Sequence, residues 1–219
     1  MKYEVVLWDF DGTLVDTSEG IFQSLRAAFT KMGMPVPEQS VLQKFIGPPI
    51  IYSFMNFMGM TEEDALCALN YFRADYEAAG IYCCKVYDGL IDLIKRLRKS
   101  GVKIGVATLK PEAMANLLLK HFQIDDLIDV CSGSISDHVG SASKSQIIDE
   151  ALQRIGYKNK SQVVLIGDTV YDADGARESG LDFAAAAYGF GINKKDKHLL
   201  DCVCMADSAA DLERFLFGD

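Results

Sequence analysis

The sequence predicts an α/β fold: a doubly wound parallel sheet with an all-α helical block inserted after its first strand. Two observations support this prediction. Short β-rich apolar runs alternate with amphipathic helical patterns along most of the chain, an order typical of a parallel sheet with helices on both faces. The segment after the first apolar run breaks this alternation, because it contains only helical patterns.

Four apolar runs have the length and composition of buried strands. They cover residues 3–8, 102–108 and 162–166, with a weaker run around 128–131. Between these runs, apolar side chains recur at helical spacing, and glycines typical of helix ends follow at Gly101 and Gly156. The two clearest helical patterns consist of Ile91, Leu93, Ile94 and Leu97, and of Ile147, Ile148, Ala151, Leu152 and Ile155.

The predicted helical block spans residues 16–84, so the α/β core consists of residues 1–15 and 85–219. Within the block, Thr61 followed by Asp64 is typical of a capping box that opens a helix. Four of the five prolines in the chain lie in this block and separate its helices. We therefore expect a separate lid, or cap, domain.

The chain has 219 residues, a length that suits one large domain or a core with a smaller insert. Hydrophobic residues make up 49% and charged residues 24%, values near globular averages that argue against long disorder. The 22 basic and 31 acidic side chains leave a net charge of −9. This charge argues against binding of a nucleic-acid polymer, but it is compatible with a small phosphorylated metabolite as substrate.

The cysteines and the N-terminal residues favour a reducing compartment. None of the six cysteines forms a Cys-x-x-Cys motif, and the three histidines lie far apart, which argues against a zinc site. The first apolar run is too short for a signal peptide, and no apolar stretch approaches the roughly 18 residues of a membrane span. We expect a cytoplasmic protein with reduced thiols and no membrane partner, present as a monomer or weak dimer.

The sharpest local motif is Asp-Phe-Asp-Gly-Thr-Leu at residues 9–14, directly after the first predicted strand. Alternation places Asp9 and Asp11 on the same side, beyond the carboxyl edge of the sheet, where open α/β sheets bind ligands. Two carboxylates this close repel each other unless a cation or a shared proton is present, so the pair predicts Mg²⁺. The alternative is an Asp-Gly turn in which Asp11 serves only the turn.

Two further strand ends and one helix start carry matching polar residues. Asp168 follows one strand and Asp172 lies one helical turn later, so both could complete an oxygen-lined Mg²⁺ site. Thr108 ends another strand and could donate to a phosphoryl oxygen, and Lys144 begins a helix, where it could neutralise a nucleophile and a phosphate. Each residue also has a purely structural alternative: Asp168 as a helix N-cap, Thr108 as a strand-end threonine, and Lys144 as a solvated lysine.

Together these residues closely resemble the four-motif pattern of the haloacid dehalogenase-like phosphohydrolases. Residues 9–13 correspond to motif one, Thr108 to motif two, Lys144 to motif three, and Asp168 with Asp172 to motif four. The resemblance spans essentially the whole chain and includes an α-helical cap of the C1 type between motifs one and two. It implies an α/β core of this superfamily and a phosphoric monoester hydrolase.

Two phrases are similar to the phosphoglycolate phosphatase and 5′-nucleotidase branch of that superfamily. They are Phe-Ile-Gly-Pro-Pro at residues 45–49 and Ala-Thr-Leu-Lys-Pro at residues 107–111. Leu109 departs from the small polar residue expected there. The resemblance therefore implies a small phosphate monoester as substrate, of the phosphoglycolate or nucleoside 5′-monophosphate type, without naming one.

The resemblance also implies a mechanism through a phosphorylated aspartate. Asp9 is expected to attack phosphorus, and Asp11 to protonate the leaving alcohol and then to activate water. Mg²⁺ is expected on Asp9, on the backbone carbonyl of Asp11 and on Asp168. Asp172 is an outer or alternate ligand in this scheme.

Thr108 and Lys144 are expected to be catalytic, and the remaining candidate site residues to bind substrate. Thr108 and Lys144, together with backbone amides after the nucleophile, would stabilise charge on the phosphoryl oxygens. Gly12, Thr13 and Lys110 are the further candidates in the core.

In the cap, Gly47 and Pro48 precede an apolar helical pattern, and free amides at that helix start could receive an anionic group. The alternative is an ordinary helix start whose apolar stripe faces the core.

Three other functions compete with Mg²⁺-dependent phosphatase action. Dehalogenation uses the aspartate nucleophile but needs neither Mg²⁺ nor a proton-donating Asp11. A phosphomutase would also use a phosphorylated aspartate, and the sequence separates it poorly from a phosphatase. A non-catalytic protein that binds a phosphorylated ligand would be favoured by loss of Asp9, Asp11 or Asp168, but all three are present.

Overall fold

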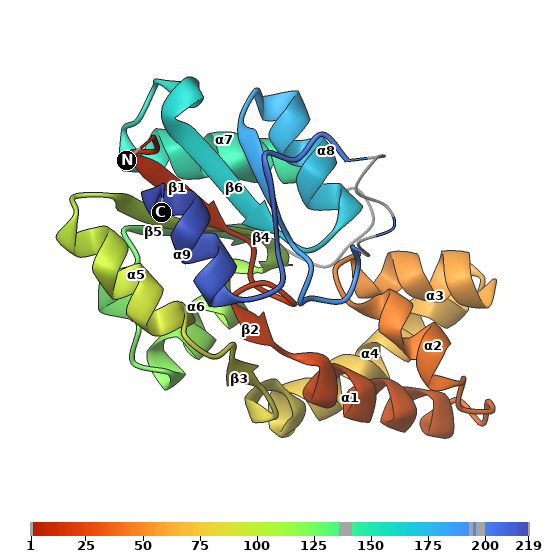
Figure 1. Cartoon of the computed structure of the whole chain (residues 1–219). Coiled ribbons are helices and arrows are strands. Elements are labelled where there is room, and N and C mark those ends of the chain that lie inside the picture. Colours follow the sequence, from red (N-terminus) through yellow and green to blue (C-terminus); the bar gives the residue numbers. More distant parts are fainter. Residues whose placement is uncertain (1, 136–141, 193–194, 196–199, 219) are drawn as a thin grey trace.

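The computed structural model describes residues 2–135, 142–192, 195 and 200–218. Its main sheet has six strands in the order β5-β4-β1-β6-β7-β8, and each adjacent pair is parallel (Figure 1). From β1 the chain winds outward to β5, returns to β6 beside β1, and winds outward again to β8. The strands are β1 (Val5–Trp8), β4 (Lys103–Pro111), β5 (Val130–Ser134), β6 (Val163–Gly167), β7 (Asp182–Ala186) and β8 (Cys204–Ala206).

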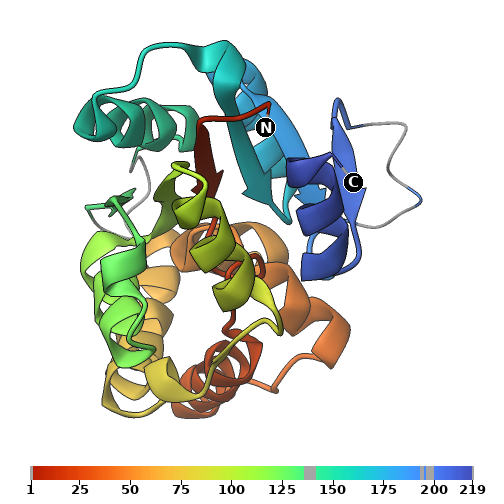
Figure 2. The same ribbon diagram turned by 60° about the vertical axis from the view of Figure 1, so that its left-hand side comes forward.

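Helices cover both faces of this sheet because side chains alternate along the buried strands. Val5 and Leu7 pack in one apolar cluster with α7 and α8, whereas Val6 and Trp8 pack on the other face with α5, α6 and α9. Figure 2 shows the two helical layers from a second direction. The helices are α5 (Leu90–Lys99), α6 (Glu112–His121), α7 (Lys144–Ile155), α8 (Val170–Ser179) and α9 (Ala209–Phe217).

The inserted block consists of four α-helices between two short antiparallel strands. Asp16 pairs with Lys85, so the chain enters and leaves the block side by side. The proposed domain boundaries at residues 16 and 84 fall at this pair. The elements are β2 (Val15–Asp16), α1 (Ser18–Lys31), α2 (Gln39–Leu42), α3 (Ile50–Met58), α4 (Glu62–Ala78) and β3 (Lys85–Val86). Single turns of 3-10 helix span Gln43–Phe45, Gly80–Tyr82, Asp125–Leu127 and Lys160–Gln162.

The cap has an aromatic interior and lies over the carboxyl ends of β1 and β6 (Figure 1). The rings of Phe29, Phe45 and Phe54 pack edge to face, with centroids 5.2 to 6.4 Å apart. Thr61 caps α4 by accepting the backbone N–H of Asp64 at 3.2 Å, as its sequence pattern predicts. The cap interior joins the core cluster that contains Trp8, so the cap rests on the sheet edge where ligands are expected.

The predicted fold class is confirmed, and the four predicted strands are present with boundaries shifted by a few residues. The weak run begins at Val130 and continues to Ser134. The strands that were not predicted are short or weakly patterned: β2 and β3 have two residues each, and β7 contains three alanines. All six cysteines are free thiols. Within the described part of the chain, no helix combines the length and apolar character needed to cross a bilayer.

Candidate active site

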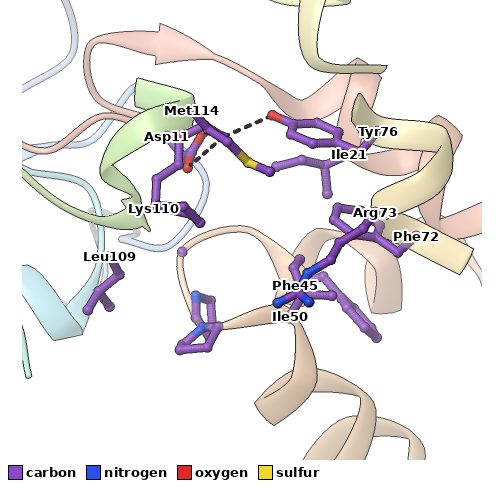
Figure 3. Close-up of a pocket in the computed structure, with 14 residues that line it drawn as sticks. Asp11, Ile21, Phe45, Ile50, Phe72, Arg73, Tyr76, Leu109, Lys110 and Met114 are labelled. Atoms are coloured by element: carbon purple, nitrogen blue, oxygen red, sulfur yellow. Dashed lines mark hydrogen bonds and ion pairs between the residues drawn. The ribbon is translucent and has the colours of Figure 1, made fainter. Parts of the chain in front are cut away.

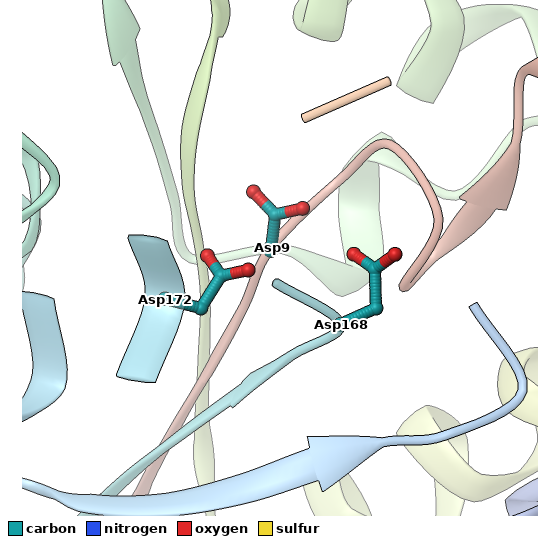
Figure 4. A group of neighbouring side chains, drawn as sticks. All are labelled: Asp9, Asp168 and Asp172. Atoms are coloured by element: carbon teal, nitrogen blue, oxygen red, sulfur yellow. The ribbon is translucent and has the colours of Figure 1, made fainter. Parts of the chain in front are cut away.

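Three carboxylates meet where the winding of the sheet changes direction. Asp9 follows β1 and Asp168 follows β6, and the parallel pairing of these strands, with Trp8 opposite Ile166, brings the two side chains together. Asp172 lies in the first turn of α8. All three side chains are buried, and one oxygen of each lies within 4.8 Å of the others (Figure 4).

The start of α8 holds Asp172 in place. Thr169 is the N-cap, and its hydroxyl and backbone N–H donate to Asp172 Oδ2 at 2.6 and 3.0 Å. The structure therefore assigns the N-cap to Thr169, not to Asp168. The carboxylate of Asp168 instead accepts from the hydroxyl of Thr13 at 3.1 Å and from the backbone N–H of Phe190 at 2.8 Å.

Lys144 is the buried counter-charge of this cluster. It opens α7 directly after Ser143, which forms a capping box with Gln146. Its Nζ lies 2.5 Å from Asp9 Oδ1 and 2.6 Å from Asp172 Oδ1. Only 4% of the side chain is exposed, so Lys144 is not a solvated lysine.

The cluster holds three carboxylates against one ammonium group, a formal excess of two negative charges. Burial, followed by repulsion from Asp172, raises the pKa of Asp9 to about 7, although Lys144 opposes this rise. Burial and the charges of Asp9 and Asp172 raise the pKa of Asp168 well above its ordinary value. Burial alone would lower the pKa of Lys144, but Asp172 and Asp9 more than offset it and the pKa is raised.

This donor set fits a divalent cation. Buried carboxylate oxygens are the ligands that Mg²⁺ prefers, and a charge of +2 would balance the excess of the cluster. Lys144 contacts one oxygen of Asp172, and Thr169 contacts the other. Asp9 and Asp168 are therefore better placed than Asp172 to hold the ion directly, and Asp172 supports Lys144.

Asp11 turns its side chain away from the other three carboxylates. Its Oδ1 accepts from the hydroxyl of Thr17 at 2.7 Å and from Lys110 Nζ at 3.1 Å. The ammonium of Lys110 also donates to the hydroxyl of Tyr76, which belongs to the cap (Figure 3). As a metal ligand, Asp11 could therefore contribute its backbone carbonyl, as expected, while its carboxylate faces the cap.

Gly12 and Thr13 shape the loop after β1. Gly12 has a φ of +86°, and a Cβ there would clash with the carboxylate of Asp168, so the position requires glycine. The side chain of Thr13 is engaged with Asp168. Thr108 is buried near the end of β4, beside β1, and its hydroxyl accepts the backbone N–H of Lys110 at 3.2 Å. These contacts position the loop and the strand end.

A pocket between cap and core begins at Asp11. Gly47 and Pro48 line it, as does Arg73 of α4 (Figure 3). Gly47 has a φ of +101°, and a Cβ there would lie 2.8 Å from Cγ2 of Thr169, so the cap loop rests against the start of α8. The pocket residues are Asp11, Ile21, Phe45, Gly47, Pro48, Pro49, Ile50, Phe72, Arg73, Tyr76, Leu109, Lys110, Pro111 and Met114.

The model of the haloacid dehalogenase-like hydrolase family matches residues 6–186, which include all the candidate site residues. The chain belongs to this family. The resemblance drawn from the four motifs is thereby confirmed, and the relatives of this chain include a phosphatase-type enzyme.

This chain is similar to two relatives and one solved structure over most of its length. The tyrosine-protein kinase PtkA of Mycobacterium tuberculosis is 36% identical over 191 residues, which are 86% of this chain and 63% of PtkA. A 5′-nucleotidase of Pseudomonas aeruginosa is 34% identical over 191 residues, 87% of this chain and 86% of that protein. The crystal structure of a predicted phosphatase from Clostridium acetobutylicum superposes with a TM-score of 0.90 at 33% identity and covers 99% of both chains.

The structure brings together site residues that the motifs did not single out. Thr17 and Tyr76 contact Asp11 and Lys110, and the backbone of Phe190 holds Asp168. Tyr76 is a buried residue of α4. Its role could not be found from the sequence because its partner lies 34 residues away on a strand.

Proposed function

We propose that this hydrolase cleaves small phosphate monoesters in a Mg²⁺-dependent reaction through a phosphorylated Asp9. The observation that carries the proposal is the buried cluster in which Asp9 forms an ion pair with Lys144 beside Asp168. The cluster has a formal excess of two negative charges. Such a cluster supports a cation and a phosphoryl group at the same edge of the sheet. When bound, Mg²⁺ supplies positive charge beside the transferring phosphoryl group.

The reaction follows two displacements at phosphorus. A carboxylate oxygen of Asp9 forms a bond to phosphorus while the ester P–O bond breaks, and the leaving alkoxide takes a proton from Asp11. Water then attacks the phosphorus atom on Asp9, and Asp11 takes a proton from that water. The bond between phosphorus and the Asp9 oxygen breaks, and phosphate leaves. Lys144 holds Asp9 in position and balances charge on the phosphoryl oxygens, which is also the role we propose for Thr108.

The pocket next to Asp11 supports a small leaving group. Its cavity volume is about 60 Å³. Apolar side chains make up most of its wall, and Arg73 adds a cation whose planar guanidinium can donate two hydrogen bonds to a carboxylate. We therefore propose an alcohol that carries its own negative charge, as in phosphoglycolate. The P. aeruginosa 5′-nucleotidase favours a nucleoside 5′-monophosphate as the second candidate substrate.

The deciding experiment measures hydrolysis of p-nitrophenyl phosphate, phosphoglycolate, nucleoside monophosphates and sugar phosphates with Mg²⁺ and with EDTA. We expect turnover only with Mg²⁺, and a loss of at least about 10³-fold in kcat for Asp9→Asn. Asp174→Asn is the matched control, because Asp174 lies on α8 but is exposed and pairs with Arg177. Near-normal turnover by Asp9→Asn would contradict the nucleophile assignment, and no turnover on any ester would favour a binding protein.

A further inference from the structure

A chain of three polar side chains runs from the cap to the catalytic loop. Tyr76 comes from α4 of the cap, Lys110 from the end of β4, and Asp11 from the loop after β1. Lys110 Nζ donates to the Tyr76 hydroxyl at 2.9 Å and lies 3.1 and 3.4 Å from the two oxygens of Asp11. These contacts are the dashed lines in Figure 3.

The ammonium of Lys110 is enclosed by these partners. Only 5% of the Lys110 side chain is exposed, and Tyr76 is also buried. The ring centroids of Tyr76 and Phe10 lie 5.0 and 5.9 Å from Nζ. Their aromatic faces therefore cover part of the ammonium surface that the Tyr76 hydroxyl and the Asp11 carboxylate do not contact. A buried ammonium that loses one hydrogen-bond acceptor must move or leave a donor unsatisfied, because little water reaches it.

We propose that Tyr76 is a positioning residue, which acts through Lys110 to hold the carboxyl of Asp11 in the orientation needed for proton transfer to the leaving group. The inference rests on the proposed function, in which Asp11 handles that proton. It assigns Lys110 to Asp11 in place of the direct substrate contact expected from the sequence.

Two features of the structure favour this role over simple packing between cap and core. Asp11, Lys110 and Tyr76 all line the pocket that receives the leaving group, so the chain lies where the proton is transferred. Lys110 approaches both oxygens of Asp11, and Thr17 contacts one of them, which restricts rotation of the carboxyl. Because Tyr76 belongs to the inserted block, the full set of contacts exists only when the cap lies against the core as it does here.

Tyr76→Phe is the sharpest variant, because it keeps the ring that stacks on Phe72 and removes only the hydroxyl. Its kcat/KM should be measured with two esters. Phosphoglycolate releases an alkoxide that needs a proton, whereas p-nitrophenyl phosphate releases a phenolate that leaves without one. We expect a loss of about tenfold with phosphoglycolate and less than about twofold with p-nitrophenyl phosphate. The ratio kcat/KM is informative because it covers the steps up to phosphorylation of Asp9.

Tyr71→Phe is the matched control on the same helix, because Tyr71 lies outside the pocket and its ring faces Lys31. This variant should leave both kcat/KM values unchanged. In a Lys110→Met background, Tyr76→Phe should cause no further change, since Tyr76 acts through Lys110. Lys110→Arg, which keeps the charge, should have a higher kcat/KM with phosphoglycolate than Lys110→Met.

Three results would overturn the inference. Equal losses with both esters would mean that Tyr76 supports the fold or substrate binding in general, and a full additional loss in the Lys110→Met background would mean that it acts independently of Lys110. Thermal unfolding of each variant shows whether it is folded. If the wild-type protein hydrolyses neither ester with Mg²⁺, the proposed function itself is wrong, and the role of Tyr76 falls with it.

Discussion

At the scale of single residues, an excess of negative charge affects the free energy of folding. The one ammonium group of Lys144 does not balance the carboxylates of Asp9, Asp168 and Asp172. The pKa of Asp9 rises from 3.8 to about 7 on folding, chiefly through burial and then through Asp172. Between these two values the folded protein binds more protons than the unfolded chain, so folding becomes less favourable as the pH rises. Asp168 contributes in the same direction, because its pKa is raised as well.

We therefore predict that the protein in EDTA loses stability from about pH 4 to about pH 7, by on the order of a few kcal/mol. The contribution of Asp9 is fully present below pH 4 and is lost as the pH passes its folded-state pKa. Thermal unfolding across this range, with Asp9→Asn as the comparison, measures it. The variant should show a weaker pH dependence than the wild type; a wild-type Tm that rises over the same range contradicts the prediction.

At the scale of elements, helix starts place the charged groups of the site. Ser143 caps α7 and thereby puts Lys144 at its first position, and Thr169 caps α8 and holds Asp172. The cap loop that contains Gly47 meets α8 at the same helix start. Each of these positions combines a local stabilising role with the placement of a site residue, so stability and turnover can be tested separately.

Ser143→Ala should lower the free energy of unfolding by about 1 kcal/mol through loss of the cap. It should also lower kcat, because the N-terminus of α7 holds Lys144 against Asp9. Ser208→Ala is the matched control: Ser208 caps α9 by accepting the backbone N–H of Asp211, outside the active site. Denaturant unfolding and steady-state kinetics on both variants check the prediction. If both variants keep the wild-type kcat, the cap of α7 does not position Lys144.

Gly47→Ala should raise KM, because the new methyl group would meet Thr169 at 2.8 Å and push the cap loop from the pocket. The left-handed φ should add about 1 kcal/mol of destabilisation. Gly59→Ala, at the end of α3, also places alanine at a positive φ, +67°, but it has no neighbour within 4 Å. It should therefore leave KM unchanged. An unchanged KM for every good substrate in Gly47→Ala would remove Gly47 and Pro48 from the proposed binding site.

At the scale of the whole molecule, the net charge of −9 is distributed so that part of it is buried at the cap–core boundary. The change in winding direction between β1 and β6 places that charge at the sheet edge, and the cap covers the same edge. A cation bound there contacts the folded protein only, because the unfolded chain separates Asp9 from Asp168. Cation binding should therefore stabilise the entire fold.

Mg²⁺ at about 100 times its dissociation constant should stabilise the protein by about 2.7 kcal/mol, a rise in Tm of about 5–10 °C for a chain of this size. Differential scanning calorimetry with MgCl₂, and with NaCl at equal ionic strength, measures this shift. Asp168→Asn should lose the Mg²⁺-dependent rise. An equal rise in NaCl, or in the Asp168→Asn variant, would show that the buried carboxylates do not bind the ion.

The sequence by itself determined the α/β class, the helical insert and the candidate residues at three strand ends and one helix start. These features are local: strand and helix periodicities, capping residues and glycines act over a few positions, and the carboxyl ends of parallel strands share one edge of the sheet. The sequence alone therefore predicted that carboxylates gather around Asp9, because Asp9 and Asp168 each follow a strand of the parallel sheet.

Only the tertiary structure decided which side chains pair across that edge. Lys110 contacts Asp11 from 99 residues away, and Tyr76 joins them from the cap. No local pattern encodes such pairs, because they depend on how the cap rests on the core and on which rotamers burial permits. The short strands β2 and β3 could not be predicted for the same reason, since two residues carry no periodicity and their pairing depends on the packed fold.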